Sequence, residues 1–136
     1  MAAKKYKYKI DLFDKDYTSK KMLEMFKSNF KHLLSQIKEL HDMDIGHFDI
    51  KLDNIMVKFQ PESRRIVKLI LIDYGLARKP PIFQIKGTPG FIDPECVIPS
   101  IAYLHEFKRP LTLKSDIWSL GIVIFQCIFN TKVHLF

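Results

Sequence analysis

A short stretch in the first half of the chain combines side chains that phosphoryl transfer requires. Asp49, Lys51 and Asn54 place a carboxylate, an ammonium group and an amide in one segment. In such a reaction a carboxylate can orient the attacking hydroxyl and accept its proton, a cation can balance the phosphate charge, and an oxygen ligand can hold Mg²⁺. Asp49, Lys51 and Asn54 suit these roles in that order. The same residue types are common in loops, so this segment does not decide the question by itself.

A second acidic residue, Asp73, follows an apolar run and precedes Tyr74 and Gly75. A carboxylate buried at a strand end is costly unless it is paired or bound to a metal. Asp73 is therefore a candidate second ligand for Mg²⁺. The alternative is an ordinary turn, in which the Asp side chain accepts a hydrogen bond from its own backbone.

The elements that must position these residues follow from the hydrophobic pattern. Apolar residues recur at steps of three and four, which predicts an amphipathic helix over about 20–42, with Thr18 or Ser19 as its cap. Residues 54–59 and 66–72 are rich in β-branched side chains and predict two strands joined by a turn.

The second half of the chain contains an expected loop and an expected helix. Residues 77–99 hold five prolines and show no regular period, which indicates an irregular functional loop. A helix over about 117–129, capped by Ser115 or Asp116, is apolar on nearly every face, so we expect it to be buried all round.

The order of these landmarks is informative. A helix is followed by H-x-D-x-K-x-x-N, a hairpin, D-Y-G, G-T-P-G-F with D-P-E, and S-D-I-W-S-L-G. Together they resemble the signature set of eukaryotic protein kinases over about residues 22–136. Asp-x-Lys and the later Gly-Thr resemble the Ser/Thr branch of that family. The resemblance implies ATP and Mg²⁺ as cofactors and a protein Ser or Thr as the phosphate acceptor.

The resemblance also implies catalytic and cofactor-binding roles for individual residues. Asp49 is similar to the catalytic base, and Lys51 to the lysine that steadies the transferring phosphate. Thr88 matches the threonine that packs near both of them. Asn54 and Asp73 match the ligands of Mg²⁺.

Further residues match the family in supporting positions. Met56 matches a residue under the adenine ring, while His47 and Tyr74 match members of a packed spine between two lobes. Asp116 matches a buried Asp that holds the catalytic loop backbone, a role that would compensate the cost of its burial. Glu95 matches a residue whose Arg partner lies in a later helical region, which we do not expect within this chain.

Departures from the family pattern limit which parts of the kinase fold we expect in this chain. Phe48 replaces the Arg that grips an activation-loop phosphate in relatives, and residues 76–87 contain no Ser, Thr or Tyr, so no phosphate switch is expected there. No G-x-G-x-x-G loop or V-A-I-K-type lysine occurs. We therefore expect an α+β, mainly α fold: a partial protein-kinase C-lobe at 18–136 with a small β-hairpin and no N-lobe. Residues 1–17 form a basic segment and a candidate remnant of the hinge strand.

Composition and charge exclude several other classes of protein. With 47% apolar residues and two cysteines, the chain can bury a core without disulfides, which favours an intracellular, cytoplasmic setting. The net charge of +7 favours anions, but no nucleic-acid motif follows the Lys- and Tyr-rich start, so we expect no nucleic-acid partner. No secretory leader or apolar run of about 20 residues is present, so we expect no membrane partner.

Three functions stay open at this point. The first is a Ser/Thr protein kinase-like enzyme, although half of its positioning apparatus is not found in the sequence. The second is a pseudokinase-like binding module that inhibits a complete kinase or takes an N-lobe from a partner. In that respect the chain is similar in architecture to truncated kinase-like proteins of some insect large DNA viruses, which would place it in the host cytoplasm. The third is a truncated, non-functional gene product.

Overall fold

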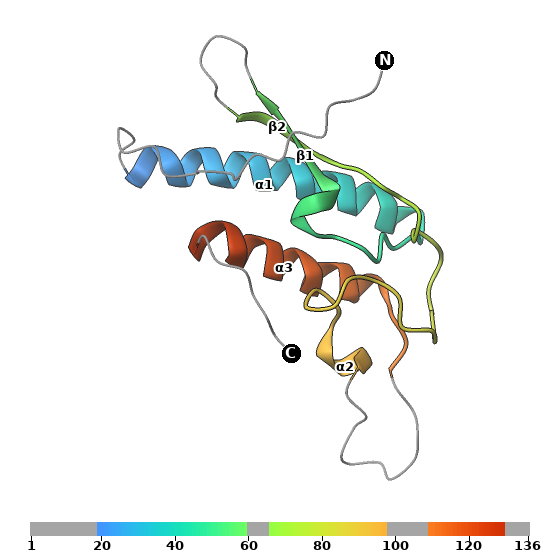
Figure 1. Cartoon of the computed structure of the whole chain (residues 1–136). Coiled ribbons are helices and arrows are strands. Elements are labelled where there is room, and N and C mark those ends of the chain that lie inside the picture. The colour runs from blue at the N-terminus through green and yellow to red at the C-terminus, as the bar shows by residue number, and fades with distance from the viewer. Residues whose placement is uncertain (1–18, 60–65, 98–108, 130–136) are drawn as a thin grey trace, which may run out of the picture.

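The computed structural model describes residues 19–59, 66–97 and 109–129, and the expected basic segment at 1–17 lies outside them. Within these residues the fold is α+β and mostly helical, as the sequence predicts (Figure 1). The elements in chain order are α1 (Ser19–Asp42), the 3-10 turn η1 (Leu52–Asn54), β1 (Ile55–Phe59), β2 (Ile66–Leu71), α2 (Pro94–Val97) and α3 (Leu113–Phe129). None of the helices in the described part combines the length and the apolar character that a membrane crossing requires.

Helix α1 confirms the predicted amphipathic pattern. Phe30, Leu33 and Ile37 lie on its buried face, while Lys27 and Lys31 are exposed. Residues three or four positions apart share one side of a helix, so this spacing produces a single apolar stripe. The helix begins at Ser19, which is its first helical residue, whereas the other expected cap, Thr18, lies outside the described residues.

The two predicted strands pair as an antiparallel hairpin, and a side chain of α1 holds β2. The register places Ile55 opposite Leu71, and the predicted turn after β1 lies outside the described residues. The Gln36 side chain donates from Nε2 to the Leu69 carbonyl at 2.9 Å and accepts from the Leu71 N–H at 3.0 Å. One amide side chain thus pairs with backbone groups of β2 that a third strand would otherwise bond.

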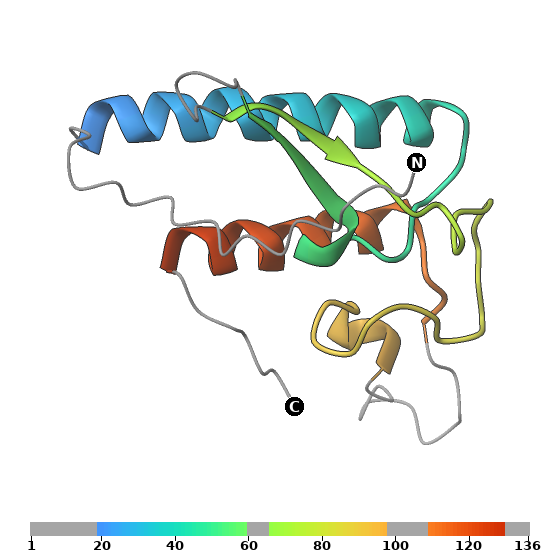
Figure 2. The same ribbon diagram turned by 45° about the horizontal axis from the view of Figure 1, so that its top comes forward.

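The main core lies where α1, the hairpin and α3 meet. Figures 1 and 2 show α1 and α3 side by side, with the hairpin crossing α1. The buried cluster draws its side chains from all three elements and from the loop before η1: Phe30, Leu33, Ile37, Ile50, Leu69, Leu71, Leu120 and Val123. This packing anchors both ends of the segment that carries Asp49.

Helix α3 differs from the expectation in two respects. It begins at Leu113, so Ser115 and Asp116 lie inside its first turn and do not precede it. The Ser115 hydroxyl accepts a hydrogen bond from the Thr112 N–H at 3.1 Å. The expectation that the helix is buried all round is wrong here, because Phe129 is 62% exposed.

The exposed apolar side chains of α3 have a simple structural cause. Leu120 and Val123 face the core, whereas the opposite side of the helix is covered by none of the described elements. That side carries Ile117, Trp118, Phe125, Ile128 and Phe129, all of them exposed. Hydrophobicity on every face predicts burial only when neighbours cover every face.

The loop after β2 is irregular, as predicted, apart from the short helix α2. The signals for α2 are present in the sequence but were not recognised: Asp93 accepts a hydrogen bond from the Glu95 N–H at 3.0 Å, and Pro94 is the first helical residue. Isolated backbone bridges join Gly46 to Arg78 and Ile82 to Leu111. A second buried cluster, made of Phe48, Ile82, Cys96 and Leu111, packs beneath the loop.

Candidate active site

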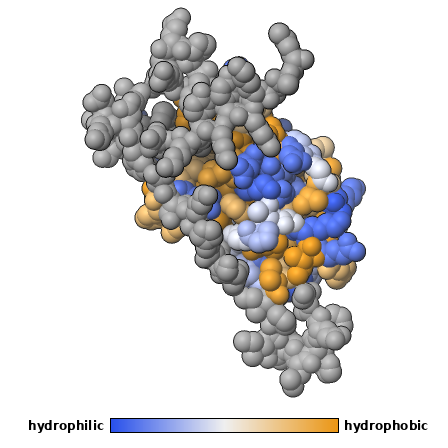
Figure 3. Space-filling model, in the orientation of Figure 1, coloured by the Kyte–Doolittle hydropathy of each residue, from blue (hydrophilic) through white to orange (hydrophobic). Residues whose placement is uncertain are grey.

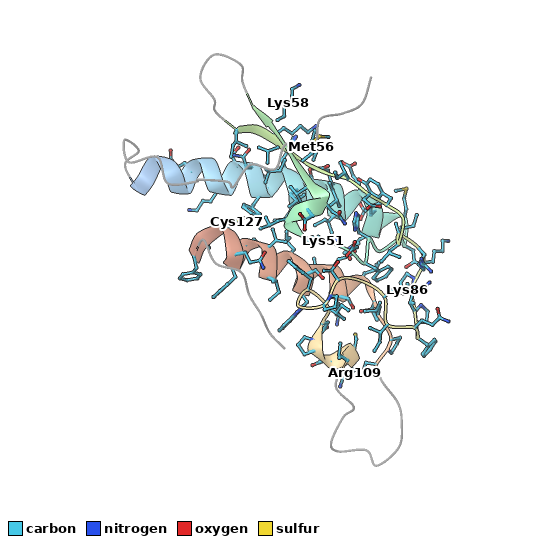
Figure 4. All side chains as sticks on the ribbon, in the orientation of Figure 1. Lys51, Met56, Lys58, Lys86, Arg109 and Cys127 are labelled. Atoms are coloured by element: carbon cyan, nitrogen blue, oxygen red, sulfur yellow. The ribbon has the colours of Figure 1, made fainter. Side chains whose placement is uncertain are left out.

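The candidate catalytic side chains meet around the carboxylate of Asp49. Its Oδ1 accepts a hydrogen bond from the Thr88 hydroxyl at 2.6 Å, and its Oδ2 accepts from Lys51 Nζ and from Asn54 Nδ2, both at 2.9 Å. Figure 4 shows Lys51 between the hairpin and α3. Asp49, Lys51 and Asn54 come from one segment, because the loop and η1 turn the chain back on itself. Thr88 arrives from the loop after β2.

Thr88 closes this group through a second hydrogen bond. Lys51 Nζ donates to Thr88 Oγ1 at 2.7 Å, so the hydroxyl accepts from Lys51 and donates to Asp49. The residue before it, Gly87, has φ +120°, and a Cβ built there would lie 2.9 Å from the carbonyl oxygen of Phe48. Glycine is needed at this position because the two backbones approach closely and φ is positive. The close packing of the site thus requires glycine directly before Thr88.

These contacts determine the charge state of Asp49. Partial burial acts to raise the pKa of its carboxyl, but the hydrogen bond from Thr88, the hydrogen bond and positive charge of Lys51, and the hydrogen bond from Asn54 together lower the pKa below its ordinary value. Asp49 is therefore ionised at neutral pH.

Asp73 and Asn54 lie at the same end of the hairpin. The Ile72 N–H donates to the Asn54 carbonyl at 2.9 Å, which extends the pairing of the strands up to Asp73. Asp73 is exposed, has φ +63°, and accepts a hydrogen bond from the Gly75 N–H at 3.3 Å. Asp73 thus accepts a hydrogen bond from the backbone of its own turn, as the turn interpretation predicts. Because its side chain is exposed, the argument that a buried carboxylate needs a metal does not apply to it.

The donor set at this end of the hairpin fits Mg²⁺ bound together with a phosphate ligand. Asn54 donates from Nδ2 to the carbonyl and the carboxylate of Asp49, so the opposite, oxygen end of its amide is directed away from them. In the part of the chain that the structure describes, no three His, Cys, Asp or Glu side chains gather as a metal site. Mg²⁺ is commonly held by one or two protein oxygens together with phosphates and water, so Asn54 and Asp73 form an adequate protein contribution.

The loop that carries Asp49 is held in place by Asp116, in the first turn of α3. Its side chain is fully buried, and its two oxygens accept hydrogen bonds from the His47 N–H at 2.7 Å and the Phe48 N–H at 2.8 Å. His41, at the end of α1, lies 2.9 Å from the same carboxylate through Nε2. His41 was not singled out in the sequence, because nothing in the local pattern distinguishes it. One carboxylate therefore joins α1, the loop and α3.

His47 is buried between the loop and the end of β2. The Asp49 N–H donates to its Nδ1 at 3.3 Å, and its Nε2 lies 3.2 Å from the Ile72 carbonyl. This pattern assigns the single proton of a neutral imidazole to Nε2. Burial lowers the pKa of His47, and the Ile72 carbonyl and nearby carboxylates only partly offset that effect. The ring contacts Tyr74 edge to face, with ring centroids 5.1 Å apart.

Phe48 occupies a buried position on the other side of the loop. It has φ +61°, and its ring lies so close to Gly46 that a Cβ there would be 2.2 Å from Phe48 Cζ. The side chain packs with Ile82 and Leu111 in the second cluster. Apolar packing, with no ion pair, thus connects this position to the loop after β2.

Met56 and Glu95 lie outside the group around Asp49. Met56 is half exposed on β1 and lies on the hairpin side of Lys51 in Figure 4. Glu95 forms an ion pair with Arg109, which lies before α3 and not in the later helical region that the resemblance implies. The Cys96 Sγ of α2 lies 3.6 Å from the Pro110 carbonyl, which places Arg109 beside α2, and local sequence does not reveal this.

The family model described as the protein kinase domain matches residues 5–135. The chain belongs to the protein kinase domain family. The resemblance seen in the motifs is thereby confirmed. The three similar proteins compared below are each named as a kinase. The ovarian-specific serine/threonine-protein kinase Lok of Drosophila melanogaster is 32% identical over 126 residues, which cover 89% of this chain and 25% of Lok.

Two further relatives give the same picture. Human death-associated protein kinase 2 is 32% identical over 79% of this chain and 27% of its own length. The rat serine/threonine-protein kinase DCLK1 is 34% identical over 85% of this chain and 25% of its own length. The chain therefore spans about a quarter of the length of these relatives.

Asp116→Asn tests the support of the catalytic loop. The amide presents one acceptor where two buried N–H groups need partners, so we expect a loss of about 2–3 kcal/mol in the free energy of unfolding, measured in urea. Asp42→Asn is the control, since its ion pair with Lys38 is exposed and should contribute less than about 1 kcal/mol. Equal losses in the two variants would contradict the role of Asp116.

His47 predicts a pH dependence of stability. Its folded pKa is below its ordinary value of 6.5, so the unfolded chain binds a proton first as the pH falls. The free energy of unfolding should decline as the pH is lowered from about 7.5 to about 5, and His47→Gln should reduce that slope. The control is His32→Gln, at an exposed position of α1. An unchanged slope in His47→Gln would show that another group is responsible.

Proposed function

We propose that this chain carries the acceptor-orienting and metal-holding half of a Ser/Thr protein kinase site, which transfers a phosphoryl group from ATP to a protein hydroxyl. The observation that carries the proposal is the Asp49 carboxylate, held by hydrogen bonds from Thr88, Lys51 and Asn54. Three donors fix its orientation, and phosphoryl transfer depends mainly on positioning and electrostatics.

In this proposal Asp49 orients the acceptor hydroxyl and takes its proton at a carboxylate oxygen. Its lowered pKa keeps it ionised and able to accept that hydrogen bond at neutral pH. Among the described residues, Lys51 Nζ bonds Asp49 and Thr88, which leaves one of its three donors for a phosphate oxygen. Lys51 is therefore both a partner of Asp49 and a phosphate-binding group.

Cofactor binding in this proposal uses the end of the hairpin. Asn54 and Asp73 would hold Mg²⁺, which when bound neutralises charge on the phosphate oxygens of ATP. Met56 is a candidate adenine contact because its side chain is exposed on β1. His47 and Tyr74 support the site through their ring contact beside Asp73.

We further propose that the described residues correspond to a C-lobe. No G-x-G-x-x-G loop and no V-A-I-K-type lysine occur in these 136 residues. The cover over ATP would then come from residues outside this sequence, including those of a partner protein. Activity of the chain by itself would be low for that reason.

Phosphate incorporation from ATP into a protein substrate tests the enzymatic proposal. Asp49→Asn should lower incorporation by about a hundredfold or more, because it removes the proton acceptor. Asp53→Asn is the matched control, since Asp53 is exposed in the adjoining turn. Lys51→Met should move the acid limb of the pH profile upward, because it removes contacts that lower the pKa of Asp49. Equal incorporation by the unmodified chain and Asp49→Asn would refute catalysis.

A second candidate function is a binding module that associates with a complete kinase and inhibits it. The exposed apolar side of α3 favours it, since such a surface on a soluble chain commonly marks an interaction site.

Adding the chain in excess to a complete Ser/Thr kinase, with fly Lok as the first probe, tests this binding function. Phosphorylation by Lok should fall, and a Phe125→Ser, Ile128→Ser double variant should restore it. A Leu34→Ser, Met43→Ser variant is the control, since those apolar side chains are exposed on and just after α1. Undiminished activity of Lok, or equal inhibition by both variants, would refute inhibition through α3.

A further inference from the structure

The loop from Tyr74 to Ile92 has an unusual charge composition. It contains Arg78, Lys79 and Lys86 but no Asp or Glu. It leads from the candidate Mg²⁺ ligand Asp73 to Thr88, whose hydroxyl donates to Asp49. Any protein segment that reaches Asp49 along this loop therefore passes positive charge.

The same loop exposes apolar side chains in a defined position. Ile82 is buried and exchanges two backbone hydrogen bonds with Leu111, at 3.1 and 2.9 Å. Successive side chains of an extended segment point to opposite sides, so anchoring Ile82 inward directs Phe83 outward. Phe83 is 74% exposed and Ile85 is 40% exposed. Both apolar side chains are thus open to solvent on a segment whose Ile82 is anchored in the second cluster.

The lysines of this loop have no acidic partners in the described part of the chain. Ion pairs there involve neither Lys79 nor Lys86. Lys79 is exposed and Lys86 is half-buried.

The neighbouring acidic side chains already have hydrogen-bond or ion-pair partners. Asp93 accepts from the Glu95 N–H, Glu95 pairs with Arg109, and Asp49 accepts from Thr88, Lys51 and Asn54. Arg78, Lys79 and Lys86 outnumber Asp73 and Asp93, the nearby carboxylates without a cationic partner in the described part of the chain, so the loop keeps a net positive charge for a ligand.

We propose that Lys79, Phe83, Ile85 and Lys86 form a substrate-selecting surface for acceptor segments that combine acidic and apolar residues. This inference rests on the proposed phosphoryl transfer. Lys86 and Thr88 line one hollow with Asp49, which connects the surface to the reacting centre. On the right of Figure 3, where Figure 1 places this loop, hydrophilic and hydrophobic residues lie side by side. Carboxylates would meet the lysines while an apolar side chain packs on Phe83 and Ile85.

Peptide binding tests the charge part of this inference without any catalysis. A fluorescent peptide with Glu and Leu around an Ala in the acceptor position is compared with the same peptide carrying Lys in place of Glu. We expect the acidic peptide to bind about tenfold more tightly to the full chain at low salt, as two exposed charge contacts would produce. A Lys79→Glu, Lys86→Glu variant should reverse the order.

The matched control is a Lys58→Glu, Lys68→Glu variant. These lysines are exposed, like Lys79, but lie on the hairpin, and Figure 4 shows Lys58 far from Lys86. This variant should keep the preference for the acidic peptide. Equal affinity for the two peptides, or an equal effect of the hairpin variant, would overturn the inference. Tighter binding to single-stranded nucleic acid or to anionic vesicles than to the acidic peptide would also overturn it.

The apolar part has its own pair of variants. Phe83→Ser should weaken binding of the acidic peptide several-fold, whereas Phe129→Ser, at an exposed position of α3, should not. Because the peptides lack a hydroxyl acceptor, the preference can hold in a chain that transfers no phosphate, and that result would refute only the proposed function. Phosphate transfer without any peptide preference would refute only the substrate-selecting surface.

Discussion

The buried carboxylate of Asp116 accepts hydrogen bonds from the backbone N–H groups of His47 and Phe48, and the geometry of the loop that carries Asp49 depends on these two bonds. Phe48 has a positive φ, which a non-glycine residue adopts only when its surroundings require it. The two hydrogen bonds and the burial of the Phe48 ring provide that requirement. With Phe48 placed in this way, the chain turns so that Asp49 faces Lys51, Asn54 and Thr88.

Two buried clusters hold the surrounding elements, and each accounts for a different part of the site. The main core fixes α1, the hairpin and α3, and so sets the positions of Asp116 and Asn54. The second cluster ties Phe48 to Ile82 and Leu111 and so positions the loop that carries Thr88. Electrostatics then acts locally: short hydrogen bonds lower the pKa of Asp49, whereas burial lowers that of His47. An ionised Asp49 carboxylate and a neutral His47 imidazole follow from these opposite environments.

The loop after β2 connects the site to its proposed substrates, and packing also holds this loop in place. Ile82 faces inward and keeps the loop in place, so its neighbour Phe83 faces outward with the lysines. Phe48 is buried against Ile82 and Leu111 in the second cluster. An apolar contact is insensitive to phosphorylation, so order in this loop comes from packing.

The sequence by itself determined the longer elements and the family. The spacing of apolar residues predicts α1, β-branched runs predict the hairpin, and the order of motifs indicates a protein kinase domain, because these signals are local and each residue's chemistry is visible in its type. The bonds that make the site are not local. Thr88 reaches Asp49 across 39 residues and Asp116 reaches Phe48 across 68.

Only the tertiary structure decided these partners, and it also decided which expectations fail. Helix α3 has the composition of a buried helix, yet one side is exposed because burial depends on neighbours. Asp73 stands at the end of an apolar strand, yet it is exposed in a turn. Glu95 of α2 pairs with Arg109, and Cys96 Sγ of the same helix lies 3.6 Å from the neighbouring Pro110 carbonyl. Residue types state what each side chain can do, whereas packing between distant segments determines which of them meet.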